Sequence, residues 1–329
     1  MDLPAAAYEA LRALDGVRIW RDAPLAPFTT IGTGGKAAAL VTVANTRAAV
    51  GVLAVAEAHE LQWVCLGAGS NFLVADAGFQ GLVIKLGEDF EFVEGLPACA
   101  APGAEPVVLT VGAAASLPRL AAATAEAGLA GLDFACGIPG TVGGAVAMNA
   151  GAYGKALQDV LVDVQFATAS GDFWISASEL DCGYRFCNLP AGSIVCAARF
   201  ELVPSETEVV LECHQSILRK RRTVQPQGVR TFGSTFKNPA QTGAGRLIEA
   251  AGLKGVRCGG AEVSKVHANF LVNMGEATTA DVLALMGLMR ERVEKDCGVV
   301  LEPEVRLVGC EFPWDSSPSE PGEPPRSDG

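Results

Sequence analysis

The stretch Gly137-Ile-Pro-Gly-Thr-Val-Gly-Gly-Ala-Val-Ala-Met-Asn-Ala-Gly-Ala-Tyr-Gly154 determines how the rest of the sequence is interpreted, because it contains six glycines, one proline and no charged residue. Glycine lacks Cβ and adopts positive φ readily, so a ligand can approach the backbone amides of such a segment. Amides without neighbouring carboxylates favour a bound phosphate. The alternative is a loop packed tightly on a neighbouring strand, and a glycine-rich stretch alone does not distinguish the two.

Two more glycine-rich segments, Thr29-Thr-Ile-Gly-Thr-Gly-Gly35 and Gly67-Ala-Gly-Ser-Asn71, lie on either side of one predicted strand-helix-strand unit. Three such segments favour one extended ligand that carries a diphosphate. No segment matches the Gly-x-x-x-x-Gly-Lys-Ser/Thr loop, and none combines Gly-x-Gly-x-x-Gly with an acidic residue on the following strand. The sequence therefore favours a flavin dinucleotide that is held in another way.

The composition indicates a globular protein of more than one domain. The chain has 329 residues, of which half are apolar and 19% are charged, so it is long enough for two or three well-filled domains. The net charge of −12 argues against a general nucleic-acid binder, because a phosphate backbone requires a positive surface. An anionic ligand therefore has to be bound by local basic groups.

The ten cysteines are scattered without a Cys-x-x-Cys pair, which is typical of reduced thiols that fill core space in a cytosolic enzyme. We expect no metal site, since the chain has three histidines and none lies four residues from a partner. The charged first 23 residues do not fit an export signal, and no apolar run reaches the length of a membrane span. These observations predict a cytoplasmic protein without a membrane anchor.

Strand and helix signals alternate along the first part of the chain, which predicts an α+β fold. Asn45 or Thr46 is expected to cap a helix that runs to about Glu60. Ser116 is expected to cap a second helix that ends before Gly128. Strands are predicted over residues 39–43, 62–66, 82–86 and 107–111, and a strand-rich stretch over residues 160–202.

A further helix is predicted over residues 206–223, and it ends in the basic run Arg219-Lys-Arg-Arg222 before Pro226. Four cations at a helix C-terminus interact favourably with the helix dipole, and they also offer a site for an anion. The residues leave both interpretations open.

The last predicted helix begins at Thr278 or Thr279 and ends at Gly298, with apolar residues at helical spacing. A final strand is predicted over residues 301–308. From Pro313 onward the chain is rich in Ser, Pro, Glu and Gly, and we expect a flexible tail.

Eight motifs in chain order resemble those of the UDP-N-acetylenolpyruvoylglucosamine reductase family. They are Thr30-Ile-Gly-Thr-Gly-Gly35, Leu66-Gly-Ala-Gly-Ser-Asn-Phe-Leu73, Gly137-Ile-Pro-Gly-Thr-Val-Gly-Gly144, Asn149-Ala-Gly-Ala-Tyr-Gly154, Tyr184-Arg185, Gly233-Ser-Thr-Phe-Lys-Asn-Pro239, His267-Ala-Asn-Phe270 and Pro303-Glu-Val-Arg306. The resemblance covers about residues 25–309. Each motif is modest alone, but the ordered set is specific.

The resemblance implies an FAD enzyme of peptidoglycan biosynthesis. It would reduce UDP-N-acetylglucosamine enolpyruvate to UDP-N-acetylmuramate, with NADPH as the reductant and FAD bound non-covalently. Hydride would pass from FAD N5 to C3 of the enolpyruvyl group, and a proton would reach C2. Covalent flavin attachment is not expected, since the glycine motifs contain no histidine or cysteine.

The resemblance also implies an FAD-binding fold of the vanillyl-alcohol oxidase type, with two α+β subdomains, and a C-terminal α+β substrate-binding domain. We expect the FAD-binding domain over residues 1–205, with subdomains over about 1–87 and 88–205. The substrate-binding domain is expected over 206–300, a strand that returns to the active site over 301–312, and a disordered tail over 313–329. We expect a monomer.

The family's functional positions are carried over motif by motif. The catalytic residues implied are Arg185, Ser234 and Glu304. The FAD-binding residues implied are Thr30, Ile31, Gly32, Gly34, Gly67, Ala68, Gly69, Ser70, Asn71, Gly137, Ile138, Pro139, Gly140, Gly143, Gly144, Asn149, Gly151 and Tyr153. The substrate-binding residues implied are Tyr153, Arg185, Lys237, Asn238 and Arg306.

The chemistry of enol ether reduction fits these three catalytic candidates. Ser234 is similar to the family's proton donor, because a hydroxyl can protonate a carbanion-like centre despite its own high pKa. Its alternative is a turn serine that bonds to the local backbone. Arg185 resembles the arginine that polarises the substrate carboxylate, a role suited to a guanidinium. Its alternative is a surface salt bridge.

Glu304 is similar to the family's glutamate near the substrate carboxylate, where it would act through Arg185 or share a proton with the substrate acid. Two neighbouring carboxylates raise the pKa of one of them, so Glu304 is expected to be partly protonated with substrate bound. Glu302 is the competing assignment. Glu304 is preferred because Pro303 directly precedes it, as in the family's motif.

Basic residues in the second half of the chain would bind the UDP diphosphate although the whole chain is acidic. These are the run Arg219–Arg222, Lys237, Lys265 and Arg306. His267 is expected to be a structural, hydrogen-bonded histidine and not an acid.

The sequence departs from the family's pattern at three places. Lys36 stands where many members carry proline, and Cys182-Gly-Tyr-Arg185 differs from the usual residues before Tyr-Arg. The short interval from Arg185 to Arg219 indicates a member that lacks the inserted substrate-covering loop.

Two alternatives remain. The first is another FAD-dependent oxidase or dehydrogenase of the same superfamily, which would need no counterpart of Ser234 or Glu304. The second is a catalytically inactive flavin-binding paralogue. The presence of Arg185, Ser234 and Glu304 together argues against it, since an inactive copy has no chemical reason to keep all three.

Overall fold

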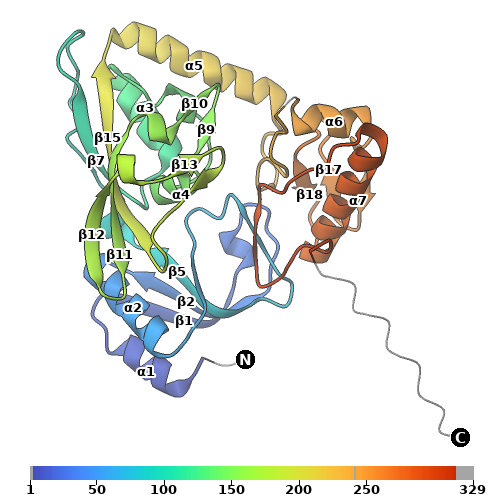
Figure 1. Cartoon of the computed structure of the whole chain (residues 1–329), viewed down its shortest axis with the longest axis horizontal. Coiled ribbons are helices and arrows are strands. Elements are labelled where there is room, and N and C mark those ends of the chain that lie inside the picture. Colours follow the sequence, from blue (N-terminus) through green and yellow to red (C-terminus); the bar gives the residue numbers. More distant parts are fainter. Residues whose placement is uncertain (1–2, 241, 316–329) are drawn as a thin grey trace, which may run out of the picture.

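The computed structural model describes residues 3–240 and 242–315, which form three larger β-sheets with their own helices (Figure 1). The first sheet has the strand order β1-β2-β5-β3, in which β2, β5 and β3 are parallel and β1 is antiparallel. Its strands are β1 (Val17–Pro24), β2 (Lys36–Val43), β3 (Trp63–Cys65) and β5 (Phe79–Leu86). The helices α1 (Ala5–Arg12) and α2 (Thr46–Ala58) share an apolar cluster with β2 and β5.

The predicted cap of α2 is confirmed, because the side chain of Asn45 accepts a hydrogen bond of 2.9 Å from Ala48 N. The glycine-rich segments lie where β2 begins and where β3 ends. Two of the three segments therefore adjoin the first sheet, at the strands β2 and β3 on either side of β5.

The second sheet is antiparallel, with the order β12-β11-β15-β7-β6 and β8 paired to β15. Its strands are β6 (Val93–Glu94), β7 (Val107–Gly112), β8 (Leu129–Ala130), β11 (Leu161–Thr168), β12 (Gly171–Ser176) and β15 (Ile194–Pro204). The helices α3 (Leu117–Glu126) and α4 (Val142–Ala147) pack into its core, where Phe134, Phe166 and Phe200 are fully buried.

The helix α5 (Thr207–Val224) runs from the second sheet toward the C-terminal part of the chain (Figure 1). That part contains β16 (Arg257–Cys258), β17 (Ala261–Val263) and β18 (Leu271–Asn273), with α6 (Ala244–Ala250) and α7 (Thr279–Cys297). The helix α7 begins with Thr278 as its cap and ends at Gly298 with φ of 68°. Its apolar face is fully buried, as the helical spacing predicts.

The C-terminal part is joined to the first sheet by main-chain and side-chain contacts. The strand β19 (Arg306–Val308) pairs in parallel with β4 (Phe72–Val74), which directly follows Asn71. The carboxylate of Asp76 accepts hydrogen bonds of 2.8 and 2.9 Å from the first amides of α7, at Thr279 and Ala280. These contacts fix α7 relative to the glycine-rich segments.

The final strand is shorter than the predicted range of 301–308. Residues 301–305 are extended but bond to a neighbouring loop instead of a sheet, since Lys237 N donates to Glu302 O and Glu304 N donates to Thr235 O. Residues 316–329 of the predicted tail lie outside the described residues. Short 3₁₀ helices cover Ala26–Phe28, Glu88–Phe90, Asp133–Ala135, Leu157–Asp159 and Ala177–Glu179.

The prediction that all cysteines are reduced thiols filling core space is wrong. Cys182 and Cys187 form a disulfide, with Cα atoms 4.0 Å apart, and Cys99, Cys213 and Cys297 are exposed. The pairing depends on a tight hairpin that brings two residues five positions apart face to face. Composition and spacing do not reveal this hairpin.

Across residues 3–240 and 242–315, no helix is both long and apolar enough to cross a membrane.

Candidate functional site

The three glycine-rich segments meet in space. Thr30 N donates a hydrogen bond of 3.1 Å to Gly69 O, which joins the first segment to the second. Ser70 Oγ donates a bond of 2.9 Å to Pro139 O, which joins the second segment to the third. Segments that are predicted separately from the sequence therefore form one continuous backbone surface.

The glycines on this surface serve two different purposes. A Cβ at Gly67 would lie 2.5 Å from Thr141 Oγ1, so this glycine is required for close packing between two segments. Gly140 has φ of 147°, and the nearest atom to a Cβ there would be Ser70 Oγ at 3.5 Å. Gly144 is exposed in the first turn of α4 and has no closer neighbour than Thr141 Oγ1, also at 3.5 Å. Close packing therefore accounts for Gly67, whereas the backbone at Gly140 and Gly144 has open space beside it.

The open backbone around Gly140 and Gly144 fits a phosphate-bearing cofactor. It lies at the N-terminus of α4, where the helix dipole favours an anion, although the amides of Val142, Gly143 and Gly144 already bond to Ala115 O, Ala113 O and Thr141 Oγ1. Its neighbours Val142 and Ala145 carry no charge and are buried. The residues present thus leave space in which a ligand could contact the protein backbone.

Two cations at the glycine-rich segments are missed by sequence reasoning. Lys85 Nζ donates a hydrogen bond of 3.0 Å to Gly67 O, and burial lowers the pKa of this lysine. Arg230 lies against Gly32, since its Cδ would be 3.1 Å from a Cβ at that glycine. A single charged residue in the mostly apolar strand β5 is a signal that could have identified Lys85. Arg230 comes from a loop without any such signal.

Arg185 is held in one orientation by its backbone and by two hydrogen bonds. It lies in the turn between the strands β13 (Cys182–Gly183) and β14 (Phe186–Cys187), with φ of 59°. Its Nε donates a bond of 2.6 Å to Glu304 Oε1, and its Nη1 donates a bond of 3.0 Å to Gly151 O. The side chains of Arg185 and Glu304 are 20% and 13% exposed. The alternative of an exposed surface salt bridge does not describe this pair.

Glu304 is the point at which several segments converge. Its amide donates to Thr235 O over 2.9 Å, and its carbonyl accepts a bond of 3.1 Å from Asn71 Nδ2. Burial raises the pKa of the Glu304 carboxyl, and the charge of Arg185 only partly offsets this effect. The competing candidate Glu302 is 73% exposed and pairs with Lys237 at 3.5 Å.

Ser234 lies next to the residue that holds Glu304. It forms an isolated β-bridge with Phe270, and it immediately precedes Thr235. Its hydroxyl makes no hydrogen bond within residues 3–240 and 242–315, so a serine bonded to the local backbone is not what the structure shows. Ser234 is half-buried. A hydroxyl that is free of local bonds is available to a ligand.

Tyr153 and Tyr184 line the same region with basic and polar partners. Tyr153 has φ of 56° and lies under Lys220 Nζ, which is 5.2 Å from its ring centre. Burial lowers the pKa of Arg221, and Tyr153 partly offsets this effect. The hydroxyl of Tyr184 accepts a bond of 3.2 Å from Asn238 N. Lys220 and Arg221 thus face the site from α5.

Other predicted residues have different surroundings. The side chain of Asn149 is engaged inside the protein, because its Nδ2 donates to Gln158 Oε1 at 2.6 Å and to Gly183 O at 2.9 Å. Arg219 pairs with Glu212 on the exposed face of α5, and Lys265 lies against Gly255.

His267 has the structural role that the sequence suggests. Its Nδ1 accepts a bond of 3.2 Å from Asn269 N, its ring contacts Phe270, and burial lowers its pKa. An uncharged histidine that accepts a main-chain bond orders the loop next to Ser234.

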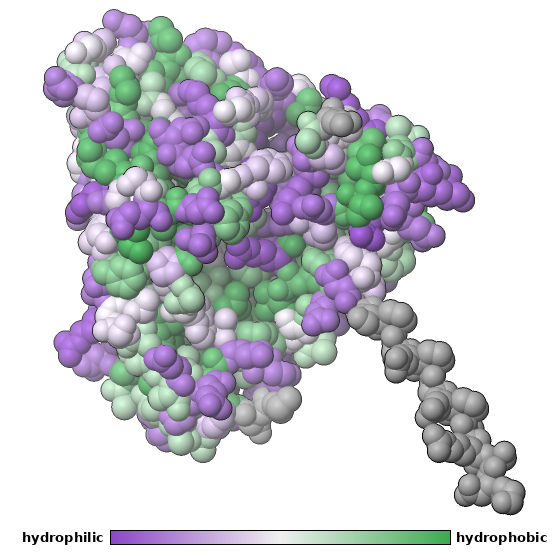
Figure 2. Space-filling model, in the orientation of Figure 1, coloured by the Kyte–Doolittle hydropathy of each residue, from purple (hydrophilic) through white to green (hydrophobic). Residues whose placement is uncertain are grey.

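Figure 2 shows a hollow between the two larger sheets and the C-terminal part, with hydrophilic and hydrophobic residues around it. The contacts of Arg185, Glu304 and Asn71 join segments from these three parts of the chain. The arrangement places an arginine-carboxylate pair, a free hydroxyl and an open glycine backbone in one region.

Comparisons with known proteins identify proteins that are similar to this chain. A family model described as "FAD binding domain" matches residues 37–176, and one described as "UDP-N-acetylenolpyruvoylglucosamine reductase, C-terminal domain" matches residues 225–308. The chain is 45% identical to the UDP-N-acetylenolpyruvoylglucosamine reductase of Anaeromyxobacter sp. (strain Fw109-5), over 88% of this chain and 89% of the relative. It is 40% identical to the same-named protein of Myxococcus xanthus (strain DK1622), over 91% and 95%.

A solved structure is also similar. The crystal structure of UDP-N-acetylenolpyruvylglucosamine reductase from Thermus caldophilus aligns with 89% of this chain and 98% of its own, with a TM-score of 0.75 and 36% identity.

Proposed function

The chain belongs to the UDP-N-acetylenolpyruvoylglucosamine reductase family, and we propose that Arg185, Ser234 and Glu304 carry out the family's reaction in it. The protein is an FAD-dependent oxidoreductase of peptidoglycan biosynthesis, which reduces UDP-N-acetylglucosamine enolpyruvate with NADPH. The predicted α+β class, with an FAD-binding part followed by a C-terminal domain, is confirmed.

The observation that carries the proposal is the contact between Arg185 and Glu304 beside the unbonded hydroxyl of Ser234. When bound, FAD supplies the hydride chemistry that the protein's own side chains lack. The open backbone at Gly140 and Gly144 supports a cofactor phosphate at this wall.

We assign the substrate carboxylate to Arg185. Its guanidinium is always charged, and its Nη2 is not used in the bonds to Glu304 and Gly151. A cation at the carboxylate stabilises the enolate-like charge that develops during reduction. Glu304 orients the guanidinium, and its raised pKa lets it hold a proton next to a second carboxylate.

We assign the proton for C2 to Ser234. Its hydroxyl is not committed to a local bond, and a carbanion-like carbon is basic enough to accept a proton from it. Tyr153, Lys220, Arg221 and Asn238 would contact the nucleotide half of the substrate, with Lys237 and Arg306 nearby. Residues 1–205 would hold FAD, residues 206–300 the substrate, and residues 301–312 would return Glu304 to the site.

All three catalytic candidates come from one copy of the chain, which supports a monomer as the functional unit. UDP-sugars and NADPH are cytoplasmic metabolites, which supports a cytoplasmic location, and the net charge of −12 argues against nucleic acid as a partner.

Anaerobic stopped-flow spectroscopy tests the function. NADPH should bleach the flavin absorbance of the purified protein, and the UDP-enolpyruvyl sugar should restore it. A protein that takes up no FAD would contradict the proposal. Restoration by oxygen or by an unrelated hydroxy acid, but not by the enolpyruvyl sugar, would favour another oxidase of the superfamily.

A further inference from the structure

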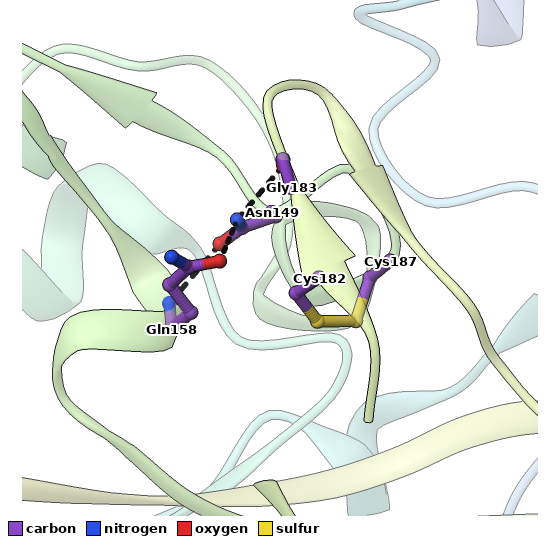
Figure 3. Close-up of a disulfide and its surroundings, with 5 residues drawn as sticks. All are labelled: Asn149, Gln158, Cys182, Gly183 and Cys187. Carbon is purple, nitrogen blue, oxygen red and sulfur yellow. Dashed lines mark hydrogen bonds between the residues drawn. A yellow bond between two sulfur atoms is a disulfide. The ribbon is translucent and has the colours of Figure 1, made fainter. Parts of the chain in front are cut away.

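The disulfide between Cys182 and Cys187 closes the hairpin that carries Arg185 (Figure 3). The strands β13 and β14 have two residues each, and the two cysteines are directly opposed in their register. Tyr184 and Arg185 form the turn between them. The disulfide therefore joins the two strands that flank Arg185, the residue that contacts Glu304.

The hairpin has two paired residues in each strand, and its turn is held by the bonds of Arg185 to Glu304 and Gly151 and of Tyr184 to Asn238. An isolated two-stranded hairpin is marginally stable, and the side chains of Tyr184 and Phe186 are largely exposed, at 53% and 48%. Arg185 has φ of 59°, a conformation that residues with a Cβ disfavour. A closed ring limits the alternatives that this turn can adopt.

The opposite side of the hairpin is anchored by an amide network. Asn149 Nδ2 donates to Gly183 O at 2.9 Å, and Asn149 in turn is held by Gln158 (Figure 3). This network holds β13, and backbone pairing of β13 with β14 and the bond from Asn188 N to Asp181 O connect the two strands. The disulfide adds a covalent connection at the base of the turn.

We propose that Cys182 and Cys187 are positioning residues for Arg185, and that reduction of their disulfide slows the step in which substrate oxidises the flavin. The inference rests on the proposed role of Arg185 in binding the substrate carboxylate. Guanidinium placement matters for charge stabilisation, whereas reduction of the flavin by NADPH does not involve that carboxylate.

The redox step uses a dithiol as the reductant. One thiolate of the dithiol attacks a sulfur of the disulfide, which forms a mixed disulfide and releases one of the two cysteines as a thiolate. The second thiol of the reductant then attacks the mixed disulfide and releases the other cysteine. Two electrons and two protons pass to Cys182 and Cys187, which become thiols, while the dithiol becomes a disulfide. Cys182 is only partly buried, whereas Cys187 is buried, so Cys182 is the more accessible sulfur. Cytoplasmic disulfides are typically transient and redox-sensitive, in keeping with such a role.

The free cysteines have other properties. Burial raises the pKa of Cys65 to about 12 and that of Cys136 and Cys196 to about 11, which keeps these thiols protonated. Cys99 and Cys297 are exposed and serve as matched controls, since neither contacts Arg185, Glu304 or the hairpin.

The test compares half-reactions in the two redox states. FAD-loaded wild type is oxidised with diamide or reduced with dithiothreitol, freed of reagent, and checked by thiol counting and mass spectrometry. We expect flavin oxidation by substrate to slow roughly tenfold on disulfide reduction, with flavin reduction by NADPH unchanged. The Cys182→Ser/Cys187→Ser protein should behave as reduced wild type in both states, and Cys99→Ser/Cys297→Ser should retain the redox effect.

An Arg185→Ala background separates positioning from general stability. If the disulfide acts through Arg185, its reduction should have no further effect on substrate oxidation in that background. The inference would be overturned if the substrate oxidised the flavin equally fast in oxidised and reduced wild type, or if the disulfide were absent after diamide treatment. It would also be overturned if disulfide reduction had the same effect in the Arg185→Ala background. Failure of oxidised wild type to react with the enolpyruvyl sugar would instead contradict the proposed function.

Discussion

Arg185 Nε donates a hydrogen bond of 2.6 Å to Glu304 Oε1, although 119 positions of the chain separate the two residues. Both side chains are mostly buried, so their interaction is screened less than that of a surface pair. The pair connects the β13–β14 hairpin to the segment that returns from the C-terminal part. In the proposed function, the geometry of this pair determines where the substrate carboxylate binds.

Arg185→Lys should slow flavin oxidation by the substrate roughly 10²-fold, because lysine keeps the charge but loses the planar donors. Flavin reduction by NADPH should be unchanged in stopped-flow traces. Arg199→Lys is the matched control, since Arg199 pairs with Asp163 at 3.0 Å in the second sheet, away from the site. Equal slowing in both variants would argue against a specific role for Arg185.

Ser234→Ala should reduce the rate of flavin oxidation by substrate about 10²-fold or more, because C2, the neighbour of the carbon that accepts hydride, then lacks its proposed proton donor. Substrate affinity and the NADPH half-reaction should change little. Ser178→Ala is a suitable control, because Ser178 bonds to Ser176 on an exposed turn. Wild-type rates in Ser234→Ala would remove the proton-donor assignment.

Gly67→Ala and Gly144→Ala should separate packing from ligand contact. A Cβ at Gly67 collides with Thr141, so this variant should destabilise the protein even without FAD. Alanine at Gly144 has room and suits a helix, so the apoprotein should keep its stability or gain about 0.5–1 kcal/mol. FAD titration of Gly144→Ala should nevertheless show weaker binding. Unchanged FAD affinity would place the cofactor away from this turn.

Glu304 should make the free energy of unfolding fall as pH rises. Burial raises the pKa of its carboxyl above the ordinary value of 4.5. At a pH between the ordinary and the raised pKa, the folded state therefore binds more protons than the unfolded state. This contribution is intact below the ordinary value and is lost as pH rises through the raised pKa. Urea unfolding from about pH 5 to about pH 7 should show wild type losing stability relative to Glu304→Gln. A free energy of unfolding of wild type that rises with pH relative to that of Glu304→Gln would contradict the raised pKa.

The sequence predicts the helices well where capping and periodicity act locally. Asn45, Thr278 and Gly298 occupy the cap positions expected of them, because a cap depends on residues within one turn. The extent of the last strand is predicted less well. Residues 301–305 bond to the loop of Thr235 and Lys237, and a pairing between distant segments leaves no local pattern.

Sequence motifs predict which residues form the candidate site, but they do not predict the contacts between these residues. Spacing cannot show that Asn71 holds the carbonyl of Glu304, that Lys85 bonds to Gly67, or that Cys182 and Cys187 join across a hairpin. Each of these contacts depends on the three-dimensional path of the backbone. The motif gives the identity of a residue, while the partner that orients it comes from elsewhere in the chain.

The pairing of β19 with β4 has a consequence for the order of events during synthesis. The glycine-rich segments and the hairpin of Arg185 are translated well before Glu304, which lies just before β19, the last strand of the described residues. A nascent or truncated chain that ends before Glu304 contains the residues proposed to hold the cofactor but not the carboxylate partner of Arg185. Under the proposed roles, cofactor binding would therefore precede catalytic competence during synthesis.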